Sequence, residues 1–257
     1  MVRRLAAIVS EVVQYWRSPA PPQRDIPYPP LRAMLNDILD EGRRKPLVHM
    51  LFQLDVTGVA RPPDVSVTAW VAKAFADTVA DDKTIQAYRH GRKLVVFEDV
   101  DICFMVEREI EGATMPVGYI VRRAQDKDVG AIHEALQRGK DTAGPSKLER
   151  AFFDLPRFVR RMVWSVVRRN PNLMKELVGT VGITSTGMLG SVTATGLPIT
   201  PLTLTLNIGT LESRDGRSIL HFNLTIDHDI LDGGPLARFA DRFQQRIKGS
   251  DSFIARN

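Results

Sequence analysis

At 257 residues the chain is long enough for one large α/β domain or two small ones. Its content of 44% hydrophobic and 25% charged residues is typical of a soluble globular protein, and no apolar run is long enough to span a bilayer. The net charge of +5 favours anionic partners, such as phosphorylated small molecules, nucleic acid or a membrane surface.

The single cysteine, Cys103, excludes an intramolecular disulfide framework and fits a reducing compartment. Because it lies in the apolar run Val100–Val106, we expect a buried strand residue rather than a nucleophile. Residues 1–9 superficially resemble a signal peptide, but polar residues interrupt the apolar region and no cleavage site follows. We therefore expect a cytoplasmic protein, with attachment to a membrane surface as the alternative. No nucleic-acid-binding motif is present, so no nucleic-acid partner is expected.

Two proline-rich stretches separate a short N-terminal helix from the rest of the chain. The apolar residues of segment 3–17 cluster on one side of a helix. The stretches 18–23 and 27–30 predict an extended linker. We expect residues 1–26 to be an appendage that docks on this molecule, a neighbouring subunit or a membrane. Residues 27–257 then form the main domain.

Hydrophobic periodicity predicts both helices and strands through the first half of the main domain. Helices are expected at 31–41, 67–79 and 128–140. Strands are expected at 48–56, on both sides of the turn at 90–91, at 100–107 and near 115–121.

The segment 146–178 is predicted to be an insertion that contains a basic amphipathic helix. The helix begins after Leu155–Pro156. Its apolar residues are Phe158, Val159, Met162, Val163, Val166 and Val167, and its polar side carries Arg157, Arg160, Arg161, Arg168 and Arg169 with no acid among them. Over 157–169 this pattern suits an acidic membrane surface or a protein partner. The alternative is that the polar side of the helix faces solvent while its apolar side packs on the core.

The chain ends with a strand, a glycine pair and a helix. Residues 218–226 favour a strand, Gly233–Gly234 permits a tight turn, and 235–248 has helical periodicity. His228 and Asp232 therefore lie on a strand-to-helix connection, where a rigid scaffold can present a side chain to substrate.

Two other interpretations of this connection stay open. Asp227, His228, Asp229 and Asp232 are all candidate metal ligands, but no further His or Cys follows at a recognisable spacing, so we expect no metal. The connection is otherwise a surface turn with a solvated cluster of aspartates.

The pattern H-x-x-x-D-G, formed by His228, Asp232 and Gly233, resembles the signature of the chloramphenicol acetyltransferase and dihydrolipoyl acyltransferase superfamily. It is more loosely similar to that of peptide-synthetase condensation domains. A second segment, Gly179–Gly190, is similar to the family's G-T-F-T-[IL]-[ST]-N-x-G-x-x-G segment and precedes His228 in the family's order. The resemblance covers roughly residues 27–248 apart from the insertion.

The resemblance implies an α/β (α+β) chloramphenicol acetyltransferase-like fold, with a mixed sheet flanked by helices, and a homotrimer with active sites between neighbouring subunits. It also implies a coenzyme A-dependent acyltransferase of class EC 2.3.1, with acyl-CoA as substrate and an unspecified thiol, hydroxyl or amine acceptor. By this match His228 is the general base and Thr184 the hydroxyl that hydrogen-bonds the oxyanion. Asp232 and Gly233 shape the loop, and Arg32 is the candidate ion-pair partner of Asp232.

Two departures from the family pattern favour an alternative function. Asp229 follows the histidine where the family often has arginine, and Ser185 stands where the family usually has asparagine. Together with the insertion, they motivate a non-catalytic trimeric scaffold or assembly subunit of an acyl-transfer or 2-oxoacid dehydrogenase-type complex. The sequence shows no lipoyl domain, so we do not expect the ordinary core of such a complex.

Overall fold

The computed structural model describes residues 2–17, 22–26, 32–110, 113–142, 151–152, 154–186 and 192–249. The chain forms two compact units, residues 1–32 and 33–257, and the expected division at 26/27 stays a prediction. The first unit contains helix α1 (Val2–Arg17), which confirms the predicted N-terminal helix. Its described side chains, from residue 4 to residue 16, are all exposed.

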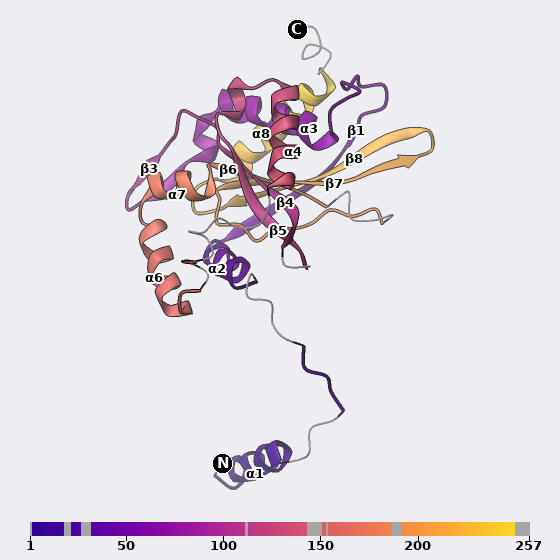
Figure 1. The fold of residues 1–257 in the computed structure, drawn as a ribbon. Coiled ribbons are helices and arrows are strands. Elements are labelled where there is room, and N and C mark those ends of the chain that lie inside the picture. The colour runs from indigo at the N-terminus through magenta and orange to yellow at the C-terminus, as the bar shows by residue number, and fades with distance from the viewer. Residues whose placement is uncertain are drawn as a thin grey trace. The chain divides into compact units, whose positions relative to one another are not determined.

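The second unit is built on a six-stranded mixed sheet with the order β1-β8-β7-β6-β4-β5 (Figure 1). The strands are β1 (Leu47–Asp55), β4 (Ile102–Ile110), β5 (Ala113–Val121), β6 (Val181–Ser185), β7 (Leu204–Arg214) and β8 (Arg217–Asp227). β6 pairs in parallel with β4 and β7, and the remaining pairs are antiparallel. A separate two-stranded sheet joins β2 (Tyr88–His90) and β3 (Lys93–Val95). The mixed sheet is thus as expected.

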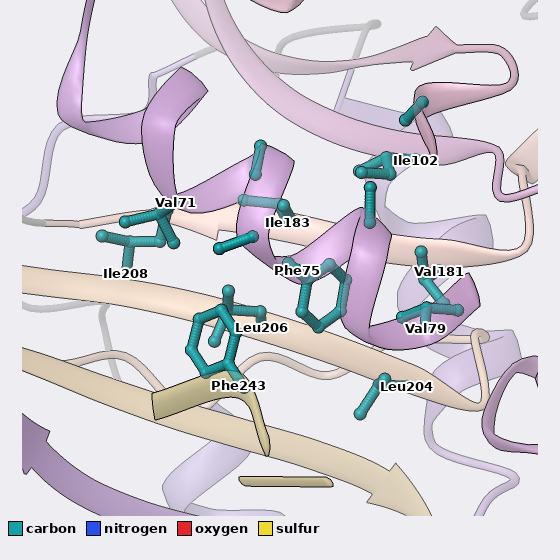
Figure 2. Close-up of a cluster of buried hydrophobic side chains, with 14 of the residues drawn as sticks. Val71, Phe75, Val79, Ile102, Val181, Ile183, Leu204, Leu206, Ile208 and Phe243 are labelled. Carbon is teal, nitrogen blue, oxygen red and sulfur yellow. The ribbon is translucent and has the colours of Figure 1, made fainter. Parts of the chain in front are cut away.

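Three helices pack on one face of this sheet: α3 (Val67–Asp81), α4 (Val129–Asp141) and α8 (Gly233–Lys248). Figure 2 shows Phe75 of α3 and Phe243 of α8 packed over Leu206 of β7. All three side chains are fully buried, and the two phenylalanine rings meet edge to face. Burial of these large apolar groups is the main force that holds the helices on the sheet.

The opposite face of the central strands is polar, because residues alternate between the two faces of a strand. In β8, Phe222, Leu224 and Ile226 join the core, so Asn223 and Thr225 point the other way. One face of the sheet is therefore apolar and covered by helices, and the other face is lined with hydrogen-bonding groups.

Within the described part of the predicted insertion lie α6 (Arg157–Val167) and α7 (Pro171–Val178), and the sequence analysis missed α7. α7 starts at a proline, and the Asn170 side chain caps it by accepting the N–H groups of Asn172 and Leu173. Arg157 and Arg160 of α6, and Arg168 directly after it, turn toward α2 (Arg32–Gly42), and most of the apolar residues of α6 are exposed. The alternative of a solvated polar side over a core stripe is therefore wrong, and binding of this helix to a membrane surface or a protein partner stays a prediction. The acidic residues of α2 attract the arginines, which leaves the apolar stripe outward.

Cys103 lies on β4, as expected, and is partly buried. Desolvation raises the pKa of its thiol to about 12, so the thiolate needed for nucleophilic chemistry is scarce near neutral pH. The 3-10 turns η1 (Lys83–Gln86) and η2 (Ala124–Asp126) also lie in this unit. No helix among the described residues combines the length and apolarity needed to cross a bilayer.

Candidate active site

His228 is the first residue after β8, on the connection to α8. Its backbone N–H donates a hydrogen bond to the carbonyl oxygen of Pro46, at 3.0 Å. Its side chain is 46% exposed, so the backbone is held while the imidazole stays open to a ligand. This arrangement suits a group that must accept a proton from a substrate.

Asp227, directly before His228, holds the connection in place. Its carboxylate lies 2.6 Å from the Lys45 ammonium and accepts the N–H of Asp229. Its carbonyl oxygen accepts the N–H groups of Ile230 and Leu231, which closes the turn. Sequence reasoning considered Asp227 only as a metal ligand. The signal that could have found its role is a carboxylate at the buried end of a strand, where an unpaired charge is costly.

Asp232 and Asp229 are on the surface of this connection. The carboxylate of Asp232 is 83% exposed and lies 3.8 Å from Nδ1 of His228, beyond hydrogen-bond distance. Asp229 makes a loose contact of 3.7 Å with Arg89, and exposed pairs of this kind contribute little stability.

Gly233 and Arg32 each begin a helix. Gly233 is the first residue of α8 and is exposed, and no atom would lie within 4 Å of a side-chain carbon added there. Arg32 is the exposed first residue of α2 and belongs to the first compact unit. Its pairing with Asp232 stays a prediction.

Thr184 and Ser185 are neighbours at the end of β6 and face opposite sides of the sheet. Ser185 lines a small cavity of about 140 Å³ with Ile183 and Leu136, under the helices. Thr184 shares the polar face with Asn207, its partner on β7. Of these two neighbouring hydroxyl groups, only that of Thr184, the residue predicted to bind the oxyanion, lies on the polar face.

The polar face around Thr184 is a network of hydrogen bonds. Asn207 accepts hydrogen bonds from the hydroxyl groups of Thr186 and Thr195, each at 3.2 Å. Asn223, the partner of Asn207 on β8, donates to the Thr225 hydroxyl at 2.8 Å. The side-chain oxygen of Asn223 is buried and has no partner among the described residues. A sheet face so rich in polar groups is suited to polar contacts rather than to core packing.

Thr184 and His228 do not meet within one chain. Thr184 pairs with Asn207, Asn207 pairs with Asn223, and His228 lies five residues beyond Asn223. At about 3.3 Å per residue and about 4.8 Å per strand, their Cα atoms are roughly 20 Å apart. Two side chains this far apart cannot both contact one carbonyl group. A site that uses both residues needs them from two copies of the chain.

No group of three or more His, Cys, Asp or Glu residues within the described ranges is placed to hold a metal ion. The four candidate ligands on the His228 connection thus do not form such a group. The Asp227 carboxylate is paired with Lys45, and the Asp232 carboxylate is exposed to solvent.

Comparisons with known proteins point to one fold. No protein-family model matches the chain, and no curated protein matches its sequence. Among solved structures, a probable dihydrolipoamide acetyltransferase from Listeria monocytogenes is similar, with a TM-score of 0.65, 18% identity, and 93% of this chain and 98% of that one covered.

Two further structures agree. A truncated catalytic core of the 2-oxoacid dehydrogenase multienzyme complex from Thermoplasma acidophilum has a TM-score of 0.63 at 18% identity, covering 88% of this chain and 99% of that one. The dihydrolipoamide acetyltransferase of Azotobacter vinelandii has a TM-score of 0.61 at 16% identity, with 92% and 99% covered. The description of the latter names a serine, a histidine and an asparagine four positions after the histidine in its catalytic mechanism. The chain therefore has the fold of these dihydrolipoamide acetyltransferase and 2-oxoacid dehydrogenase complex cores.

Proposed function

We propose that this chain, which has the fold of the dihydrolipoyl acyltransferase catalytic cores, is a coenzyme A-dependent acyltransferase. The observation that carries the proposal is the exposed His228 imidazole on a connection fixed by Lys45 and Asp227. A base in acyl transfer needs this combination of a held backbone and an open ring. Asp232, four positions after His228, matches the spacing of the histidine and asparagine named for the Azotobacter enzyme.

In the proposed reaction, acyl-CoA is a substrate and the acceptor carries a thiol, hydroxyl or amine. The neutral imidazole of His228 takes the acceptor's proton as the acceptor atom bonds to the thioester carbonyl carbon. The carbonyl becomes a tetrahedral oxyanion. When it collapses, the carbon–sulfur bond breaks, and the CoA sulfur receives the proton back from the imidazolium. An intermediate of this kind needs a hydrogen-bond donor placed at the oxyanion.

The Thr184 hydroxyl supplies that donor, and it comes from a neighbouring chain. The separation of roughly 20 Å within one chain supports a shared site. In a cyclic trimer each interface joins the His228 edge of one copy to the Thr184 face of the next, giving three equivalent sites. A closed homotrimer is therefore part of the proposal, and an isolated chain would be inactive.

A second candidate function is a trimeric scaffold that has kept the fold without the chemistry. Two observations favour it. Asp229 places a negative charge beside His228, where phosphates of CoA would be repelled, and Ser185 faces the helices rather than the polar sheet face. The scaffold predicts assembly without turnover.

The test is acceptor-dependent release of CoA from acyl-CoA. Release is followed with a thiol-detecting reagent for hydroxyl and amine acceptors, and by mass spectrometry for thiol acceptors. The proposal predicts turnover that His228→Ala abolishes and that His133→Gln, a control on α4, leaves intact. Turnover that survives His228→Ala contradicts the mechanism. Absence of turnover with all three acceptor classes favours the scaffold.

A further inference from the structure

Helix α6 turns its arginines toward α2. The guanidinium of Arg160 lies 2.7 Å from the carboxylate of Asp37, and both groups are buried. Arg157 pairs with Asp40 and Arg168 with Glu41, each at 2.9 Å. Figure 1 shows the two helices side by side at the edge of the second unit. Three charges of the basic helix are therefore neutralised inside the molecule.

The apolar stripe of α6 points outward as a result. Phe158, Met162 and Val166 recur every four residues, which places them on one side of the helix. They are 67%, 66% and 60% exposed. In α7, Leu173 and Leu177 are exposed at the same spacing. An amphipathic helix with its apolar side exposed normally marks a binding surface.

The rim of this stripe is basic. Arg161 and Arg169 are exposed, and neither has a carboxylate within ion-pair distance among the described residues. Of the six basic side chains from Arg157 to Val178, three are paired with α2 and Lys175 is paired with Asp101, so Arg161 and Arg169 supply the remaining positive charge. The surface that covers the stripe is therefore apolar inside and negatively charged at its edge.

Helix α1 has the same character, although it belongs to the other compact unit. Its exposed apolar residues are Leu5, Ile8, Val9, Val12, Val13 and Trp16. It carries three arginines and one glutamate. Exposed Tyr15 and Trp16 near its end are residue types that favour the boundary between water and lipid.

We infer that α6 and α1 both lie in the headgroup region of an anionic lipid bilayer and bind the protein to it peripherally. A bilayer presents the same apolar interior and anionic surface to two helices that are not parts of one compact unit. A folded protein partner would need a separate complementary site for each. Two linked segments that bind the same surface hold a chain there more tightly than either segment alone.

The experiment is flotation of the full-length protein with vesicles. Vesicles of phosphatidylcholine and phosphatidylglycerol in equal amounts should bind it at low salt, and phosphatidylcholine vesicles should bind it far less. Replacing Phe158 and Met162 by Ser should abolish most of the binding. Changing Arg161 and Arg169 to Gln should weaken it about fivefold per arginine. Ile8→Ser with Val12→Ser should weaken it independently through α1.

Matched controls come from the β7–β8 hairpin, where Leu211 is exposed and Arg214 and Arg217 lie in solvent. Leu211→Ser and the pair Arg214→Gln and Arg217→Gln should leave flotation unchanged. Absence of binding at low salt overturns the inference. So does dissociation of the oligomer by the Phe158 and Met162 changes, because the stripe would then be an interface between copies. Binding that survives those changes also overturns it.

Discussion

The ammonium group of Lys45 lies 2.6 Å from the carboxylate of Asp227, the residue that precedes His228. Lys45 lies two residues before β1, and Asp227 ends β8, so this pair closes the end of two hydrogen-bonded strands. The catalytic candidate is thus attached to the sheet through its neighbour.

Lys45→Met should damage the site through this anchor. Loss of the lysine leaves the Asp227 carboxylate buried and unpaired, which should cost on the order of 3 kcal/mol of unfolding free energy. Turnover should fall with it as the His228 loop loosens. Urea unfolding and steady-state kinetics measure the two effects. The control is Lys83→Met, which breaks an exposed pair with Glu98 and should change neither. Unchanged stability and turnover in Lys45→Met would show that the His228 loop does not depend on the Lys45–Asp227 pair.

Thr184→Ala should lower kcat about 10²–10³-fold with little change in KM, because the hydroxyl contacts charge that develops only in the transition state. Thr184→Ser keeps the donor and should retain most of the activity. Ser185→Ala, on the opposite face of β6, should be nearly silent. If Ser185→Ala lowered kcat and Thr184→Ala did not, the oxyanion donor would be Ser185 rather than Thr184.

Asp232→Asn should lower turnover while leaving the free energy of unfolding nearly unchanged. The side chain is largely in solvent, and asparagine is also a good residue at a helix N-cap, so unfolding free energy should change by less than about 0.5 kcal/mol. Turnover should fall, because the carboxylate lies beside the imidazole that becomes cationic during the reaction. A large stability loss with proportionate loss of activity would make Asp232 a structural support only.

Asp101 should make the fold sensitive to acid. Its burial disfavours the charged carboxylate, but hydrogen bonds from Lys175, the Arg123 N–H and Arg122 outweigh burial and lower its pKa. A pKa lowered by folding adds stability above the unfolded value of about 3.9, and this stability is lost as pH falls through the folded value.

Asp101→Asn should therefore cost on the order of 3 kcal/mol at pH 7, and the difference from the native protein should shrink below about pH 4. Urea unfolding across this range measures it. Asp126→Asn, in an exposed pair with Arg123, serves as the control and should show almost no difference. A constant deficit at all pH values would mean that Asp101 acts through packing rather than charge.

The periodic elements could be predicted from the sequence because burial decides them. The helix at 67–79 was placed to within two residues of α3, and the strand at 218–226 to within one of β8. α6 could not be oriented, because its pattern permits either face inward, and the deciding acids lie on α2 more than a hundred residues earlier. Asp227 was missed for the same reason, since its partner Lys45 is 182 positions away. The motif indicated His228 and Thr184 but could not reveal the distance between them.

The central claim is that His228 and Thr184 act together across two chains. Mixing two inactive variants, His228→Ala and Thr184→Ala, tests it most directly, after the chains are co-expressed and the mixed oligomers isolated. Every mixed cyclic trimer has one interface of its three that joins an intact His228 to an intact Thr184, so about a third of native activity should return in the isolated mixed oligomers. Activity that stays at the level of the two separate variants would contradict a shared site.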